Sequence, residues 1–481
     1  MAVMEPMALM PRNLINCVIT MNYKLFLRFL FFYLSLTMPA LTWAAKWEVT
    51  PSTSVDYTYS DNINLSQTNR VGDVAITASP QVQIKGKGGR VDLDAHYQMQ
   101  VVRYRDNTQS NHIYNSASLA ANYKIIPDSF NVETNARYGQ QAISLTSSPV
   151  PQSNINISSN RTNTLTYQLK PVYKGRIGNT AQFLASFNYE AIDYDNTSIQ
   201  QRHVVNTRYN VALNSTQAYK NLSWSLSQMR NNYGVQDNVD NYDSKTDLTL
   251  YYRVANKLSL IAGGGNEQNH IVGSQFGTGG SYWNGGILWQ PTIHTSIEVR
   301  RWKRFFGDTT SVIATRQGKR SRFSLTYDEN FTTTSRIQAD TALIPGYVVL
   351  ATVDEFILQK ALYATLSAHT ARTELGLTGD RRNLTYQKTL KTEEYTSYSL
   401  FLNWNFTNRT SVRISGSRQV SGFIDTQERL TLNSREISFN RSIGKKSSSS
   451  FRYINYNSKS FTGNNKYTAN IYELTFNWVF K

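Results

Sequence analysis

The chain has 481 residues, a formal net charge of +17, a mean hydropathy of −0.44 and one cysteine. The single cysteine excludes a disulfide-stapled fold. No apolar run after the N-terminal region reaches about 18 residues, which excludes a helical membrane protein. The positive charge is spread along the chain and favours anionic partners such as lipid phosphate or an acidic polymer.

Residues 1–44 have the features of an export signal. Lys24 and Arg28 precede an apolar stretch, and residues 42–44 form a small-x-small cleavage site. Cleavage is therefore predicted before residue 45, leaving a chain without cysteine and with a charge of +15. Residues 1–20 match no targeting segment, so initiation at Met21 is the simpler interpretation. Export argues against nucleic acid as a partner.

Alternation of apolar and polar residues recurs through the rest of the chain. In residues 91–101 the odd positions are apolar or aromatic and the even positions are polar or charged, as in a strand with one face in lipid and one in water. Similar stripes occur at 183–189, 248–254, 293–299 and 398–406. Aromatic residues make up 12% of the chain despite its negative hydropathy, a combination typical of transmembrane barrels, whereas a soluble sandwich needs a denser apolar interior.

Connections between the stripes alternate in length. Short turns rich in Gly, Pro, Asn and Asp occur at 85–89, 126–128, 176–179, 407–409 and 444–447, and longer polar loops at 60–73, 145–163 and 235–244. Outer-membrane barrels have short turns on the periplasmic rim and long loops outside. The sequence therefore predicts an all-β fold, a transmembrane antiparallel β-barrel over residues 45–481 in the Gram-negative outer membrane. Its strand count is even and about 20, within a range of roughly 18 to 22.

Residues 333–368 break the alternation. Because they follow a strand that we expect to descend, they are predicted to form an insertion on the periplasmic rim or in the lumen. Two further strands are the alternative.

The last ten residues, YELTFNWVFK, alternate strictly. The stretch resembles the C-terminal assembly signal of outer-membrane barrels, which implies recognition by the barrel assembly machinery. The apolar positions that carry this resemblance are Tyr472, Leu474, Phe476, Trp478 and Phe480. Lys481 follows the terminal aromatic residue, a one-residue departure from the usual pattern.

The first fifty residues after the cleavage site resemble the opening of the outer-membrane barrel family associated with PEP-CTERM and exosortase systems. The shared features are Trp47, Pro51, Asp61, Asn62, Pro80 and the glycine-rich turn 86–89. The resemblance implies a porin-like barrel linked to exopolysaccharide production, with periplasmic polysaccharide-export proteins as partners. It implies no catalytic residues and no cofactor.

A basic stretch is the best candidate for a functional surface. If Ile297 and Val299 face lipid, the alternate residues of that stripe face inward; these are Glu298, Arg300, Trp302 and Arg304. If Phe323 and Leu325 on the next stripe face lipid, its alternate residues also face inward; these are Arg320, Arg322 and Asp328. Arginine binds carboxylate and phosphate bidentately, so Arg300, Arg304, Arg320 and Arg322 are predicted to line one anion-selecting wall. Alternatively, the same residues lie at the outer rim and bind lipopolysaccharide phosphates, or are merely solvated.

Other chemistry has little support. The six histidines lie more than ten residues apart, so no metal-ligand spacing exists. The glycine run at 262–266 lacks a phosphate-loop pattern and is interpreted as a kinked strand. His294 and Ser296 have the spacing of a base and a nucleophile on one strand face, which leaves an outer-membrane lipid hydrolase as a third hypothesis after a polymer-transport barrel and a docking barrel for a surface assembly.

Overall fold

The computed structural model describes residues 46–106, 108–142, 155–156, 161–195, 203–216, 221–234, 240–270, 278–333, 356–387, 390–424, 429–460 and 466–480. The predicted signal segment and its cleavage site lie outside these residues. Among the described residues, no helix is long and apolar enough to cross a membrane.

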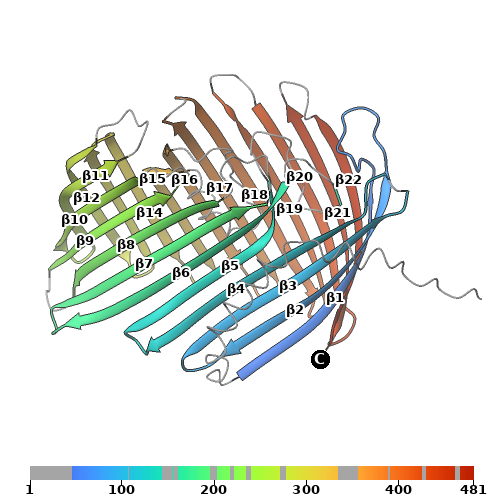
Figure 1. Cartoon of the computed structure of the whole chain (residues 1–481), viewed down its shortest axis with the longest axis horizontal. Helices are drawn as coiled ribbons and strands as arrows, with labels where there is room; N and C mark the ends of the chain where they lie inside the picture. The colour runs from blue at the N-terminus through green and yellow to red at the C-terminus, as the bar shows by residue number, and fades with distance from the viewer. Residues whose placement is uncertain are drawn as a thin grey trace, which may run out of the picture.

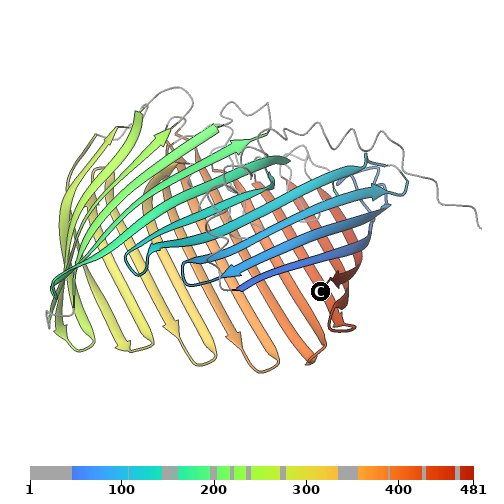
Figure 2. The same ribbon diagram turned by 60° about the horizontal axis from the view of Figure 1, so that its bottom comes forward.

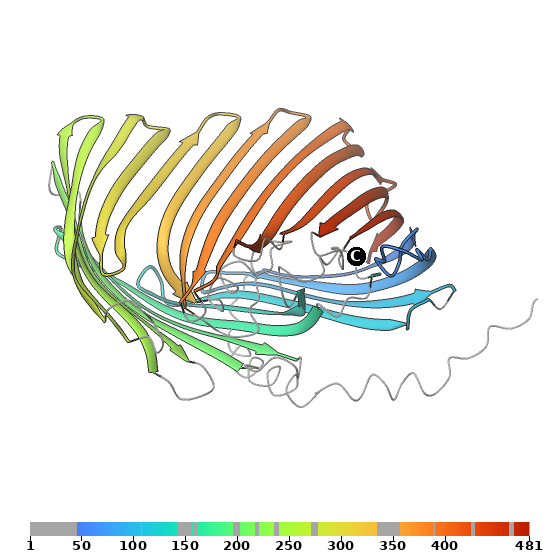
Figure 3. The ribbon, with the colours of Figure 1, turned by 90° about the horizontal axis from the view of Figure 1, so that it is seen from above.

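Within these described ranges, twenty-two antiparallel strands form one closed sheet (Figure 1). They are β1 (Lys46–Ser60), β2 (Asp73–Lys87), β3 (Val91–Tyr104), β4 (His112–Ile126), β5 (Phe130–Ala142), β6 (Arg161–Ile177), β7 (Ala181–Tyr194), β8 (His203–Ser215), β9 (Leu222–Gly234), β10 (Asp240–Ala255), β11 (Leu258–His270), β12 (Gly279–Thr292), β13 (Thr295–Arg304), β14 (Gly307–Gln317), β15 (Ser321–Thr333), β16 (Phe356–His369), β17 (Thr373–Tyr386), β18 (Thr392–Thr407), β19 (Thr410–Phe423), β20 (Arg429–Ser442), β21 (Ser447–Ser460) and β22 (Tyr467–Val479). Each strand pairs with the next, and β22 pairs with β1 through nine residue pairs from Ser52↔Val479 to Ser60↔Ile471. Closure leaves the sheet without a free edge, as lipid requires. Figure 3 shows the wall curving round as a flattened ring.

The alternation predicted from the sequence sets the two faces of this wall. Tyr97 of β3, Tyr252 of β10 and Leu400 of β18 are exposed on the outer face, where the stripes at 91–101, 248–254 and 398–406 all point. Residues paired directly across neighbouring strands share a face, so the register carries this assignment around the whole ring. The predicted all-β barrel is confirmed, with 22 strands rather than about 20.

The two rims differ as the sequence predicts. The connections β2–β3, β4–β5, β6–β7, β10–β11, β14–β15 and the later ones of the same parity are tight turns, which Figure 2 shows along one edge for β10 to β22. We call this edge the short-turn rim. Both the start of β1 and the end of β22 lie on it, as an even strand count requires.

The predicted insertion at 333–368 is wrong in extent, and its luminal alternative concerns residues outside the described part of the chain. β15 continues to Thr333 and β16 begins at Phe356, so residues 356–368 are a strand. Because β15 leads away from the short-turn rim, the connection leaves the barrel at the opposite rim, with the long loops. The error arises from β14, whose outer face carries only Val312 and Ala314 as apolar residues. Missing one strand reverses the direction assigned to the next. Residues 334–355 lie outside the described part of the chain.

This rim assignment makes a topological prediction. An epitope tag inserted in the 145–163 loop should be labelled on intact cells, because that loop connects β5 and β6 at the long-loop rim. A tag at 88–89, in the β2–β3 turn, should be labelled only after the outer membrane is permeabilised. Antibody labelling with the opposite pattern would reverse the orientation of the barrel.

Candidate functional site: the luminal wall

The inner faces of β10 to β13 carry the candidate residues Arg300 and Arg304. Both lie on β13, on the face opposite the exposed Trp283, Ile287 and Trp289 of the paired strand β12. The predicted inward direction of these two side chains is therefore consistent with the register.

Arg300 is held by two partners within the wall. Its Nε donates to Glu298 Oε1 at 2.6 Å, and its Nη2 donates to the hydroxyl of Tyr251 on β10. The guanidinium lies 5.2 Å from the centroid of the Tyr251 ring and 5.9 Å from that of Trp302. The positive charge of Arg300 is therefore already compensated by groups within the protein.

Arg304 is neutralised in the same way by a neighbouring strand. Its Nε donates to both carboxylate oxygens of Glu267 on β11, at 2.9 and 3.2 Å. The Glu267 side chain is only 4% exposed, and Lys245 Nζ lies 3.9 Å from it and from Asp247. This part of the wall is therefore close to electrically neutral. Its three cations and three carboxylates are Arg300, Arg304, Lys245, Glu298, Glu267 and Asp247.

Aromatic rings fill the space around these charges. Lys245 Nζ lies 4.6 Å from the ring centroid of Tyr282 and 4.1 Å from that of Trp302, both within cation–π distance. Tyr282 donates its hydroxyl proton to Asp247. Gly265 makes this placement possible, since a Cβ there would lie 2.9 Å from the Tyr282 hydroxyl and would overlap Thr246 O. The glycine run at 262–266 is thus part of strand β11, as predicted.

Arg320 and Arg322 do not join this group. Arg320 lies in the turn before β15 and Arg322 is the second residue of that strand, both exposed at the short-turn rim. On the intervening strand β14, the residue opposite Arg322 is six positions from the one opposite Arg300, which corresponds to about 20 Å along the strand. The four arginines predicted as one wall therefore form two separate groups.

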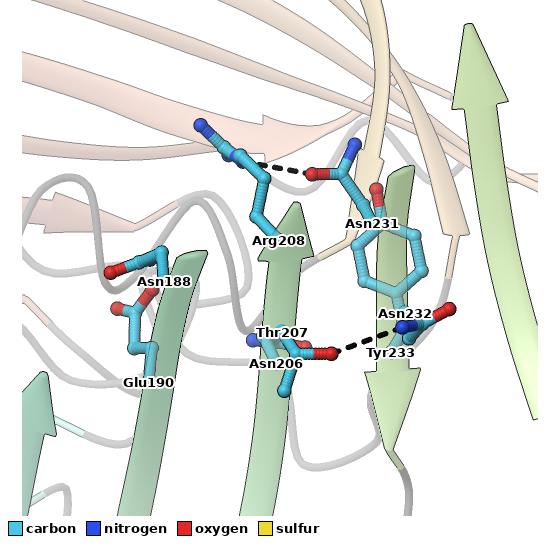
Figure 4. Close-up of a pocket in the computed structure, with 8 residues that line it drawn as sticks. All are labelled: Asn188, Glu190, Asn206, Thr207, Arg208, Asn231, Asn232 and Tyr233. Carbon is cyan, nitrogen blue, oxygen red and sulfur yellow. Dashed lines mark hydrogen bonds between the residues drawn. The ribbon is translucent and has the colours of Figure 1, made fainter. Parts of the chain in front are cut away.

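A second polar region lies on β7, β8 and β9 (Figure 4). Arg208 Nε donates to Asn231 Oδ1 at 2.8 Å, and Asn231 in turn donates to Asp243 of β10 at 2.8 Å. Among the described residues, the buried side-chain amide of Asn206 has no hydrogen-bond partner. The amide atoms of Asn206 are buried, whereas the half-buried amides of Asn188 and Asn210 lie on the same inner face and offer donors and acceptors to a hydroxyl-rich molecule.

The residues of the opening resemblance have structural roles at the barrel seam. Asp61 accepts hydrogen bonds from the backbone N and the side-chain Nδ2 of Asn470, both at 2.7 Å, and so ties the β1–β2 loop to β22. The fully buried Asn62 donates to Ser66 O at 2.7 Å and to Thr468 O at 3.0 Å. The pair therefore fixes the first loop against the closing strand.

The remaining motif residues lie on β1 and β2, closer to the short-turn rim. The ring of Trp47 covers Gly86, where a Cβ would lie 2.6 Å from it. Pro51 O accepts from the backbone N of Phe480 at 2.8 Å, which holds the C-terminus against β1. Pro80 interrupts the β2–β3 ladder, because proline has no N–H to donate.

Replacing Asn62 by Ala is expected to destabilise this loop by about 1–3 kcal/mol, because the substitution leaves buried backbone groups without partners. Limited proteolysis of the barrel in detergent should then cut within 61–72 faster than in the wild type. The exposed Thr68 of the same loop, changed to Ala, is the matched control and should leave the rate unchanged. Equal rates in all three proteins would show that the Asn62 contacts do not hold the loop.

The anchored loop is part of an apolar cluster on the lumen side of the seam. Ile63 of the loop and Ile155 pack against inward residues of the wall strands; these are Ala75, Val102, Tyr104, Ile454, Tyr456, Tyr467, Ala469 and Ile471. Tyr104 donates to Ile155 O at 2.6 Å, and Asn156 donates to Ile63 O at 2.8 Å. The cluster fills the lumen next to the seam at the long-loop rim.

The C-terminal strand faces as the sequence predicts. Tyr472, Leu474, Phe476, Trp478 and Phe480 are all exposed on the outer face. The structure does not assemble a hydrolase site from His294 and Ser296: His294 lies exposed in the β12–β13 turn, and Glu298 is engaged by Arg300. Among the described residues, no group of three His, Cys, Asp or Glu side chains could hold a metal ion.

No protein-family model matches the chain, and no curated protein matches it in sequence. Among solved structures, a mutant of the ferric enterobactin receptor from Pseudomonas aeruginosa in complex with enterobactin aligns with a TM-score of 0.50 at 9% identity, over 91% of this chain and 82% of the receptor chain. A second mutant of that receptor aligns with the same score at 8% identity, over 91% and 81%. The fold is that of an outer-membrane β-barrel. The low identity means that the likeness concerns the fold alone.

Sequence reasoning missed the partners that neutralise the arginines. Glu267 and Lys245 lie on strands that the 248–254 stripe and the glycine run predict, and their odd numbers place them inward. The register between β10, β11 and β13 brings them to the arginines, and the sequence pattern does not give that register.

Proposed function

We propose that this protein is an outer-membrane channel that passes an extracellular polysaccharide or its precursor. The observation that carries the proposal is the luminal wall, in which amide, hydroxyl and aromatic groups dominate and the charges of β10 to β13 are paired with one another. Amides hydrogen-bond sugar hydroxyls, and aromatic rings pack against the apolar faces of sugars. A wall specialised for small ions would instead keep charges unpaired.

The size of the barrel supports the same function. Barrels of 16 to 18 strands enclose an aqueous channel, and those of about 22 strands are wide enough to hold a plug. An enclosed space of this width accommodates a hydrated polymer chain. The outer face, with its exposed aromatic and aliphatic side chains, suits an outer-membrane location and contact with lipid and lipopolysaccharide.

The resemblance of residues 47–97 to the exosortase-associated barrel family supports a role beside exopolysaccharide production or PEP-CTERM protein sorting. In that role the short-turn rim meets periplasmic export proteins. The protein carries no enzymatic activity in this proposal.

A docking barrel that anchors a surface assembly is the second candidate. The apolar cluster at the seam favours it, because Ile63 and Ile155 occupy part of the lumen. A barrel that serves as an anchor has no need for an open path.

Conductance in a planar bilayer separates the two functions. The channel function predicts ion conductance that is interrupted by brief blockades when oligosaccharides are added, with dwell times that lengthen with chain length. Changing Asn188 and Asn210 to Leu should shorten the dwell times, because both half-buried amides lie on the inner face of β7 and β8. Absence of conductance, in the wild type and in a variant lacking residues 334–355, would favour the docking barrel.

A further inference from the structure

Positive charge is concentrated at the short-turn rim. We define the basic rim as all the connections on the short-turn rim, from β2–β3 to β20–β21 and including β12–β13, with the five strand residues on either side of each, together with the first five residues of β1 and the last five of β22. Within the described residues it holds nineteen lysines and arginines: Lys46, Lys85, Lys87, Arg90, Lys124, Lys174, Arg176, Arg253, Lys257, Arg316, Lys319, Arg320, Arg322, Arg372, Arg409, Arg413, Arg441, Lys445 and Lys446. It holds seven acidic residues: Glu48, Asp92, Asp94, Asp128, Glu133, Glu298 and Glu374.

The rest of the described chain is nearly balanced, with twenty-three basic and nineteen acidic residues. The net charge of the protein therefore resides mainly at one end of the barrel. Summed charges at the mouth of a low-dielectric wall raise the local concentration of oppositely charged ligands.

Internal pairing neutralises little of this charge. Asp92 pairs with Lys124 at 2.8 Å, and Asp94 lies 4.0 Å from Lys85. Glu133 and Glu298 pair instead with Lys170 and Arg300, which lie above the rim. Among the described residues, no carboxylate lies within 4 Å of the cationic groups of Lys174, Arg176, Arg253 or Arg322.

Most strand residues of the basic rim have side chains that point to the luminal side of the wall. Lys46, Lys85 and Lys87 share the inner face with Asp94, to which Lys85 is paired in the register. By the same alternation, Lys174 and Arg176 of β6, Arg253 of β10 and Arg322 of β15 have the parity of the inward residues Lys170, Asp247 and Asp328. Only Arg316 and Arg441, among the strand residues of the basic rim, have the outward parity that would bring them to lipid headgroups.

We infer that the basic rim is the entrance at which an acidic polysaccharide enters the barrel from the periplasm. This inference rests on the proposed transport function and specifies its substrate class. Exposed lysines and arginines around a mouth attract a polyanion over a distance of about 10 Å at 0.1 M salt. Beyond the mouth, the paired charges and amides of the wall hold no ion strongly, so a captured chain can move on.

The test is polymer binding to the purified barrel in nanodiscs of zwitterionic lipid. One variant changes Lys174, Arg176, Arg253 and Arg322 to Gln. A matched control changes Arg70, Lys303, Arg429 and Lys459 to Gln, which removes the same charge from exposed positions toward the other rim. The probes are polygalacturonate and, as a neutral polymer of equal length, dextran.

We expect the wild type and the control to bind polygalacturonate equally and the rim variant to bind it about tenfold or more weakly, with dextran binding unchanged. Wild-type binding should also weaken as salt rises from about 50 to 500 mM. Equal binding by the rim variant, or binding that is independent of salt, would overturn the inference.

Three further outcomes distinguish the sources of failure. If the rim variant still binds polygalacturonate and is weakened only in its association with phosphatidylglycerol nanodiscs, the basic rim is a headgroup-binding surface. The inference is then wrong. If the wild type binds polygalacturonate at the rim but passes neither ions nor polymer, the entrance is correct and the transport function fails. If neutral polymer passes and the rim variant behaves as wild type, transport stands and the entrance fails.

Discussion

Replacing Glu267 by Gln is expected to destabilise the barrel by about 3–5 kcal/mol, because removing one member of a buried charge pair leaves its partners uncompensated. Glu267 faces Arg304 and Lys245 with a side chain that is only 4% exposed. Unfolding in urea, with the barrel in lipid vesicles, measures the difference. The exposed Glu374, changed to Gln, is the control and should alter stability by less than about 0.5 kcal/mol.

A second variant distinguishes a buried network from a solvated wall. Adding Arg304→Gln to Glu267→Gln should cost less than the sum of the two single changes, since the two residues share one interaction. Additive effects, or a cost below about 1 kcal/mol for Glu267→Gln, would mean that water screens the pair. Arg300 and Arg304 would then be available to anions, as the sequence alone predicts.

Placing a charge on the lipid face of the closing strand should have a comparable effect. Leu474→Arg is expected to cost about 2–4 kcal/mol, because the residue lies near the middle of β22 and points outward. The variant should also accumulate less in the outer membrane, since the alternating strand resembles the assembly signal. Heat-modifiable mobility in gels and the unfolding midpoint measure the two effects.

Ser450→Arg is the matched control for Leu474→Arg. Ser450 pairs with Thr475 on the neighbouring strand, at nearly the same depth, and faces the lumen. An arginine there should change stability little. Equal costs for both substitutions would contradict the assignment of the two faces.

The sequence predicts which side chains face outward more accurately than it predicts the number of strands. Period-two alternation is a local property, so the outward direction of Tyr97, Leu250 and Trp404 follows from the residues themselves. The alternation does not reveal β14, because its lipid face carries only valine and alanine beside polar residues. That omission lowers the strand count and reverses the rim at which the connection between β15 and β16 is expected.

The candidate site depended on information that the sequence does not hold. The inward parity of Arg300 and Arg304 could be predicted from their neighbours. Their neutralisation could not, since Glu267 and Lys245 come from strands 30 or more residues away and the register that brings them together is set by the closed sheet. The basic rim was hidden for the same reason, because its residues are scattered along the chain and meet only at the turns.

The roles of Asp61 and Asn62 are only partly predictable from the sequence. The resemblance identified them as residues of a motif, and the polar loop around them was predicted. Their bonds to Asn470 and Thr468 close the first loop onto the last strand over a sequence separation of more than 400 residues. No local pattern predicts such a contact.

Polymer release from vesicles tests the transport function most directly. Fluorescent oligogalacturonate is trapped in vesicles that contain the barrel, and its escape is compared with that from vesicles containing an eight-stranded barrel, whose interior is filled by side chains. The proposed function predicts release through this protein, slowed when Lys174, Arg176, Arg253 and Arg322 are changed to Gln in barrels that present the short-turn rim to the vesicle interior. Retention of the polymer by vesicles that leak small ions through the same barrel would contradict it.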